Sequence, residues 1–97
     1  MNRIERITEM ENHLDAAEPA VKELCDALEK YISVQNDIAA LTAYYTSPLW
    51  MEDYRADEKN ELPKNLKRGV LSEDAVYNLL CDNNKILDTI NNLISHN

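Results

Sequence analysis

The stretch "ITEMENHLDAAEPAVKELCDALEKY", residues 7–31, carries the pattern that decides the fold. Its apolar residues recur at alternating steps of three and four, a seven-residue repeat typical of coiled coils and of helices that pack side by side. The repeat predicts a long N-terminal helix over residues 2–45, in which the stripe then shifts slightly. The positions of the stripe are Ile7, Met10, Leu14, Ala17, Val21, Leu24, Leu28 and Tyr31, followed by Ile38 and Tyr45.

Pro19 is the one residue that interrupts this pattern. A proline removes a backbone hydrogen bond and costs about 3 kcal/mol in a helix interior. The helix therefore either kinks at Pro19 and continues, or ends near residues 18–19, with Pro19 in the first turn of a second helix. The sequence leaves both alternatives open.

The composition favours a single all-α domain over residues 1–97. Hydrophobic residues make up 44% of the chain, too many for a disordered protein, and 97 residues are enough for one small domain. One glycine and three prolines supply few of the turns that a sheet requires. We therefore expect helices joined by irregular connections.

Two further helices are predicted, a short middle helix over residues 48–59 and a C-terminal helix over 73–94. Ser47 and Pro48 suit the start of the first, and Ser72 suits the cap of the second. Gly69 is expected to adopt a backbone conformation closed to other residues, so we interpret Gly69 and Ser72 as a joint. The C-terminal helix then packs antiparallel to the first as a helical hairpin or small bundle.

The lengths of these helices leave part of the first one without a partner. A last helix of about 22 residues covers only the second half of a first helix that is twice as long. If the first helix is continuous, its N-terminal stripe packs against another chain, in a homodimer or with a helical protein partner. If it breaks at Pro19, the same residues fold back as a third helix. This candidate interface comprises Ile4, Ile7, Met10 and Leu14.

Charged residues of the middle helix and the following loop form a candidate polar cluster. Asp53 and Asp57 lie four residues apart on one helical face, where two carboxylates can bind a divalent cation. They can equally pair with basic residues across the loop or face solvent. The cluster comprises Asp53, Asp57, Glu58, Lys67 and Arg68.

The charge balance and the motifs exclude several classes of function. A net charge of -8 repels phosphate backbones, so we expect no nucleic acid partner. The apolar runs are too short to span a membrane and the N-terminus is unlike a signal peptide, so we expect a cytoplasmic protein without a membrane partner. The two histidines and the single glycine form no metal or phosphate motif, so no catalytic residue and no cofactor is predicted.

The segment "YYTSPLWMEDYRADEKNELPKNLKRGVLSEDAVYNLL", residues 44–80, resembles a family of small bacterial proteins, the domain of unknown function 4298 family. The opening "RIERITEMENHLD" is similar to the start of that family. The resemblance implies a helical fold and no known activity. Two residues depart from the family pattern: Asn60 replaces a glycine, whose left-handed conformation asparagine tolerates, and Pro19 is additional.

Together these features predict a non-catalytic module for self-association or protein–protein interaction. The alternative is a protein that binds a small ligand or a divalent metal, or a hydrolase, using the acidic middle helix and Arg68.

Overall fold

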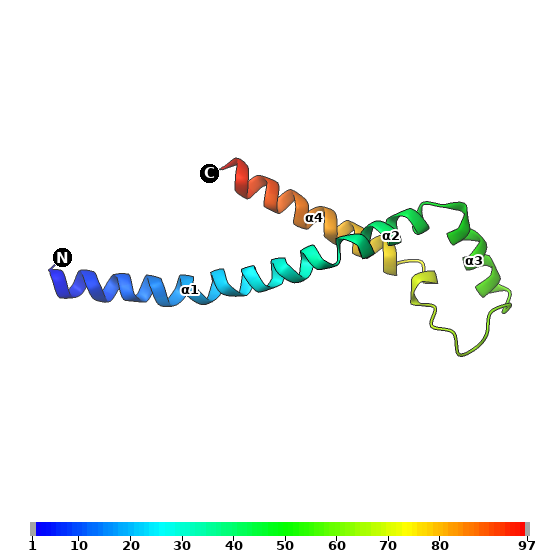
Figure 1. Cartoon of the computed structure of the whole chain (residues 1–97), viewed down its shortest axis with the longest axis horizontal. Helices are drawn as coiled ribbons and strands as arrows, with labels where there is room; N and C mark the ends of the chain where they lie inside the picture. Colours follow the sequence, from blue (N-terminus) through cyan, green and yellow to red (C-terminus); the bar gives the residue numbers. More distant parts are fainter. Residues whose placement is uncertain (1, 97) are drawn as a thin grey trace. The chain divides into compact units, whose positions relative to one another are not determined.

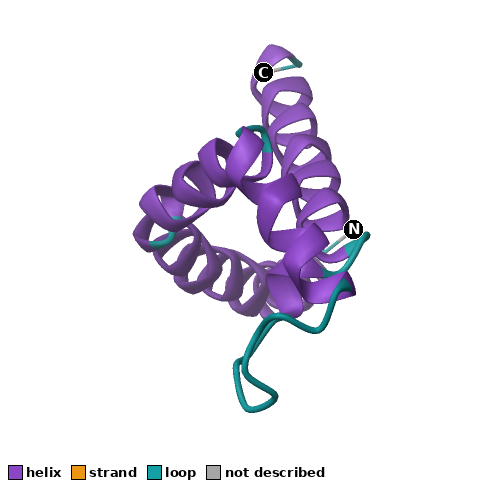
Figure 2. Cartoon of the chain, turned by 90° about the vertical axis from the view of Figure 1, so that its right-hand side faces the viewer, coloured by secondary structure: helices purple, strands orange, loops and turns teal. Residues whose placement is uncertain are grey.

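The structure, a computed structural model, describes residues 2–96, and every regular element in that range is helical (Figures 1 and 2). This confirms the all-α class. The elements are α1 (Arg3–Ser33), α2 (Gln35–Tyr45), α3 (Pro48–Glu58), a short 3₁₀ helix η1 (Gly69–Leu71) and α4 (Ala75–Ser95). The chain divides into two compact units, Met1–Gln35 and Asn36–Asn97. The first contains α1 and the second contains α3, η1, α4 and nearly all of α2.

Helix α1 runs through Pro19 without ending there (Figure 1). Its N-terminus is fixed by Asn2, whose side chain accepts the backbone N–H of Glu5 at 2.8 Å. Ala16, Ala17 and Ala20 surround the proline, and alanine has the strongest helix propensity. Of the two alternatives left open by the sequence, a helix end at residues 18–19 is therefore excluded.

The interruption of the predicted helix over residues 2–45 occurs instead at Val34, between α1 and α2. Ser33 Oγ donates to the carbonyl of Lys30 at 2.6 Å, and Gln35 Nε2 donates to the carbonyl of Tyr31 at 2.7 Å. In a continuous helix these carbonyls would accept the backbone N–H groups of residues 34 and 35. Instead, the N–H of Val34 donates to the carbonyl of Tyr31 at 3.3 Å, one residue closer than in an α-helix, and the two polar side chains complete the bonding of these carbonyls. The long helix thus becomes two.

Asn60, two residues after the end of α3, has the left-handed backbone conformation, with φ of 57°. The N–H of Glu61 donates to the carbonyl of Ala56, and the N–H of Asn60 donates to that of Asp57, each at 3.0 Å. This pair of bonds is the Schellman motif, which satisfies the last carbonyls of a helix. Asn60 therefore occupies the left-handed position after the helix that glycine usually takes.

Gly69 does not have the special conformation that we predicted for it. Its φ is not positive, and it forms the first residue of η1. A Cβ atom added there would meet nothing within 4 Å. The prediction was wrong because the chain reverses its direction over a long loop after Asn60 (Figure 2), so no tight bend is required at residue 69. Ser72 does act at the start of α4, because its Oγ accepts the N–H of Ala75 at 3.2 Å.

The core of the second unit is small. Leu71 and Val76 are buried, with 6% and 3% of their surface exposed. Leu71 ends η1 and Val76 lies in the first turn of α4, and η1 contacts both α3 and α4. The short 3₁₀ helix is therefore the element on which the two longer helices pack.

Substitutions at Asn60 and Gly69 test whether the left-handed backbone conformation occurs at residue 60 and not at residue 69. We expect Asn60→Ala to lower the free energy of unfolding by about 1 kcal/mol, because alanine is strained in the left-handed region. Asn60→Gly should have little effect or stabilise. Gly69→Ala should stabilise by about 0.4–1 kcal/mol, because it restricts the unfolded chain without a clash. Urea unfolding followed by Trp50 fluorescence measures all three. A loss of stability in Gly69→Ala would contradict the assignment.

Candidate functional site

Helix α3 presents four hydrogen-bonding side chains on a single face. Trp50, Asp53, Tyr54 and Asp57 follow the spacing i, i+3, i+4, i+7, which places residues along one side of a helix. Each bonds to a different part of the second unit. We call these four residues the α3 face, and they connect the helix to α2, η1, the long loop and the residues just before α4.

Arg68 joins the C-terminal end of α3 to the loop. One guanidinium nitrogen, Nη1, forms an ion pair with Asp57 Oδ1. The other, Nη2, donates to the backbone carbonyls of Pro63 at 3.0 Å and Lys64 at 3.2 Å. Both charged side chains are half-buried, so the ion pair is less screened by water than one on the open surface. Arg68 thereby fixes a loop that has no regular structure of its own.

Asp53 bonds to α2 through Tyr44, whose hydroxyl donates to Oδ2 at 2.5 Å. Partial burial, this hydrogen bond and the carboxylate charge together raise the pKa of Tyr44 to about 12. The hydroxyl of Tyr54 donates to Glu73 Oε1 at 2.8 Å, and this bond is the main reason that the pKa of Tyr54 is raised. Both tyrosines are therefore protonated donors over the ordinary pH range.

Trp50 is the centre of an aromatic row. Its ring stacks on Tyr54 at a centroid distance of 5.2 Å and meets Tyr45 edge to face at 5.1 Å. The indole N–H donates to the carbonyl of Val70 at 2.9 Å. Aromatic pairs in these geometries contribute about 0.5–1.5 kcal/mol beyond the area that they bury. Trp50 thus links α2, α3 and η1 without being fully buried.

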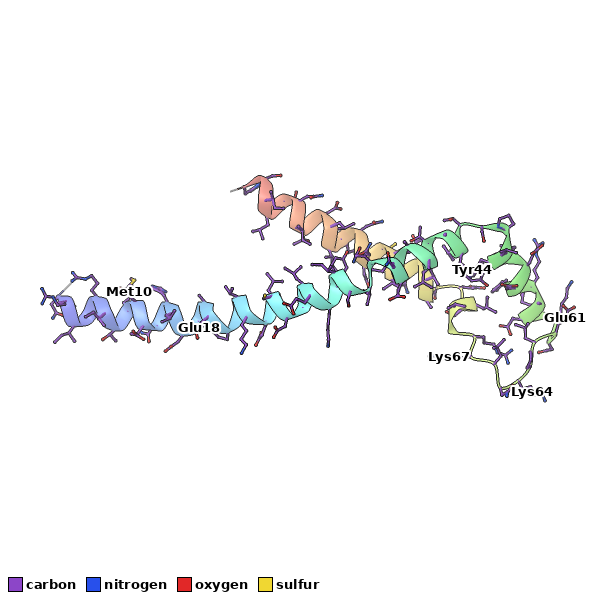
Figure 3. The ribbon with its side chains drawn as sticks, in the orientation of Figure 1. Met10, Glu18, Tyr44, Glu61, Lys64 and Lys67 are labelled. Carbon is purple, nitrogen blue, oxygen red and sulfur yellow. The ribbon has the colours of Figure 1, made fainter. Side chains whose placement is uncertain are left out.

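The structure brings together part of the predicted polar cluster. Asp57 and Arg68 form an ion pair, whereas Asp53 bonds to Tyr44. Lys67 lines a hollow of about 280 Å³ with Tyr44, Asp53 and Arg68. Figure 3 labels Lys67 on the loop and Tyr44 near the end of α2. Glu58 is exposed, and no ion pair involving Glu58 or Lys67 occurs among residues 2–96.

The two aspartates of the cluster each have their own protein partner. Asp53 accepts from a tyrosine and Asp57 from an arginine, and an arginine beside a carboxylate competes with a cation for the same oxygens. Over residues 2–96, no three His, Cys, Asp or Glu side chains lie close enough together to hold a metal ion. The arrangement that is present supports the fold of the second unit.

The predicted interface residues on α1 are all exposed. Exposed fractions are 76% for Ile4, 54% for Ile7, 53% for Met10 and 52% for Leu14. No residue of α1 is buried, and Met10 and Glu18 are labelled along the helix in Figure 3. The apolar stripe continues through two further exposed residues, Val21 and Leu24, to the half-buried Leu28 and Tyr31.

Sequence reasoning missed the hydrogen bonds of Trp50 and Tyr54 and the role of Tyr44. The signal was present in the spacing, because the pair of aspartates and the pair of aromatic residues each lie four apart and share one face of α3. Considered without the aromatic residues, the two aspartates left a cation site open as an alternative. Considered as one face, all four residues indicate a helix that other elements pack around.

Comparison with protein families gives a match over most of the chain. The family model described as Domain of unknown function (DUF4298) matches residues 7–93. Comparison with curated proteins and with solved structures finds no match to the chain. Within residues 2–96, none of the helices combines the length and the apolar character that a membrane span requires.

Removal of the Arg68 guanidinium should loosen the loop and destabilise the second unit. We expect Arg68→Ala to lower the free energy of unfolding by about 1–2 kcal/mol, because Asp57 then loses a half-buried charged partner. Lys67→Ala is the matched control, and its effect should stay within about 0.5 kcal/mol. Chemical unfolding of both variants measures the difference. Equal effects of the two substitutions would contradict the role of the ion pair.

The raised pKa of Tyr44 predicts a loss of stability in alkali. Because the pKa of the folded state, about 12, exceeds the ordinary value of 10.0, the contribution of Tyr44 is complete below pH 10 and disappears as the pH rises towards 12. Ultraviolet titration of the five tyrosines should show a late-ionising group that Tyr44→Phe removes. Asp53→Asn should move that group to lower pH. An unchanged late phase in Tyr44→Phe would contradict the assignment.

Proposed function

We propose that this chain, which belongs to the family described as Domain of unknown function (DUF4298), is a self-associating helical module that pairs with a second copy of itself through α1. The observation that carries the proposal is the surface of α1. This helix has 31 residues and an apolar stripe along its length, and none of its residues is buried. A stripe of this kind is the surface by which helices pair.

The low stability expected for α1 on its own indicates that this helix needs a partner. Most of the stability of protein helices comes from the packing of an apolar face rather than from intrinsic propensity. Pro19 adds a cost of about 3 kcal/mol within the helix. A helix of this length that contains a proline requires packing against another surface to remain folded.

The position of Pro19 is compatible with pairing. In the seven-residue repeat abcdefg, with Ile7 at position a, Pro19 occupies position f. Position f lies on the side of the helix opposite the a and d residues, so the proline ring stays outside the interface. Positions a are held by Ile7, Leu14, Val21 and Leu28, and positions d by Met10, Ala17, Leu24 and Tyr31.

The continuity of α1 favours a second chain over the fold-back that the sequence left open. Because α1 does not end at Pro19, the segment from Ile4 to Leu14 does not fold back as a separate third helix. A second copy brings an apolar stripe of the same length and spacing. Full burial of one such side chain contributes about 1.5–3 kcal/mol, and a dimer covers two sets of half-exposed side chains.

The second unit supports a structural role more than a catalytic one. The side chains of the α3 face bond to α2, to η1, to Arg68 of the loop and to Glu73 just before α4, so these side chains are engaged in holding the unit together. A stable second unit attached to an exposed, repeat-containing helix suits a module that assembles proteins. A cytoplasmic location stays a prediction from composition.

A second candidate function is the binding of a small anion or a divalent cation. The observation that favours it is the hollow of about 280 Å³ where Lys67 and Arg68 meet Asp53 and Tyr44. Ligand pockets are usually about 300–1,000 Å³, so this hollow suits at most a small ion. Thermal unfolding with inorganic phosphate or magnesium tests it. A rise in melting temperature with phosphate should be abolished by Lys67→Ala, and a rise with magnesium by Asp53→Asn, because the first variant removes a cation and the second a carboxylate. No rise with either would exclude binding at the concentrations used.

A charge placed in the apolar stripe should break the dimer. We expect the wild-type chain to approach twice its 11.2 kDa mass at high concentration in light scattering. Leu14→Asp, at position a, should stay monomeric, because the dimer would bury two unpaired carboxylates. Asn12→Asp adds the same charge at position f and should dimerise like the wild type. A wild-type chain that is monomeric at every concentration would overturn the proposal.

A further inference from the structure

The charges that flank the α1 stripe are distributed in an ordered way. With Ile7 at position a, the g positions near the N-terminus are basic, Arg6 and His13, and the e positions are acidic, Glu11 and Glu18. Positions e and g lie beside the apolar seam and determine partner choice and orientation in coiled coils. Towards the C-terminus the same positions carry no charge, being Ala20, Cys25, Ala27 and Ile32.

In a parallel, in-register pair of helices, the basic g residues of one helix lie beside the acidic e residues of the other. In that arrangement each g residue meets the e residue of the following heptad on the other helix. Arg6 then lies beside the partner subunit's Glu11, and His13 lies beside the partner subunit's Glu18. By the twofold symmetry of a homodimer each contact occurs twice.

In an antiparallel pair that uses the same stripe, acidic e residues of the two helices lie beside each other and repel. When the exposed segment from Ile7 to Leu24 is aligned with its reversed copy, e residues meet e residues. Glu11 then lies beside the partner subunit's Glu18, again twice, and neither carboxylate has a cation beside it. Arg6 meets alanine positions instead, so its charge gains no partner.

We infer that two copies of α1 pair in parallel and in register, with Arg6 and the partner subunit's Glu11 determining the orientation. The inference rests on the proposed self-association and specifies its geometry. Among residues 2–96 of the single chain, neither Arg6 nor Glu11 forms an ion pair, so both are available. His13 already has its Nε2 atom 3.9 Å from Glu9 Oε1, so Arg6 provides the stronger contact.

The substitution Glu11→Arg distinguishes the two orientations by the sign of its effect. In a parallel dimer it places an arginine beside Arg6 of the partner subunit and should raise the dissociation constant about 2- to 30-fold at low salt. In an antiparallel dimer it removes the contact between two glutamates and should lower that constant. Sedimentation equilibrium at low and high salt measures the constant, and salt should reduce the difference.

Two variants serve as controls for this measurement. Glu23→Arg makes the same change in net charge at the outward position c, so it reports the effect of lower overall repulsion alone. The double variant Arg6→Glu with Glu11→Arg restores an opposite pair and should recover the wild-type constant. Weaker association of Glu11→Arg relative to Glu23→Arg, with recovery in the double variant, supports the inference. Tighter or equal association overturns it.

Disulfide formation gives an independent test in a background of Cys25→Ser and Cys81→Ser. Met10→Cys and Leu24→Cys each place one thiol at position d, and in a parallel, in-register dimer both should form an interchain disulfide in glutathione buffer. An antiparallel twofold axis can pass near one of these positions and not both. Asn12→Cys, at position f, is the control that should stay reduced. Dimers in which fewer than both positions cross-link contradict the orientation and leave self-association intact, whereas monomers overturn both.

Discussion

One chain buries very little of its apolar surface, and the rest of the account depends on this constraint. Leu71 and Val76 are the buried core, whereas the stripe of α1 is exposed from Ile4 to Leu24. Burial of apolar surface is the main favourable term in folding. We therefore expect α1 to gain its stability by association, so that the stability of this helix depends on protein concentration.

The second unit compensates for its small core with directed contacts. The α3 face reaches four neighbours through one ion pair, two tyrosine hydrogen bonds and one indole hydrogen bond. Asp53 and Asp57 thus each have a protein partner, and among residues 2–96 no three His, Cys, Asp or Glu side chains lie close enough together to hold a metal ion. A carboxylate that holds a loop or a neighbouring helix is less available to a metal ion or substrate.

The sequence predicted the helices well where one pattern dominated and poorly where side chains competed with the backbone. The heptad repeat identified α1, and Ser47 with Pro48 located the start of α3. The break at Val34 depends on hydrogen bonds from Ser33 and Gln35, whose strength relative to the backbone bonds cannot be known from residue types alone.

The left-handed turn shows a different limit of sequence reasoning. A lone glycine suggested that position 69 needed a special backbone conformation, yet that conformation occurs at Asn60, where the Schellman motif ends α3. Glycine permits a left-handed residue without requiring one. In the polar cluster, Asp57 pairs with Arg68 across the loop, which was one of the alternatives left open, whereas Asp53 bonds to Tyr44, a partner that the residue types did not indicate.

The measurement that tests the proposed pairing most directly is hydrogen–deuterium exchange of α1 amides at several protein concentrations. If a second copy covers α1, protection of residues 7–24 rises with concentration while protection of α3 stays constant. Protection of α1 that does not change with concentration would contradict the claim that a second copy covers this helix.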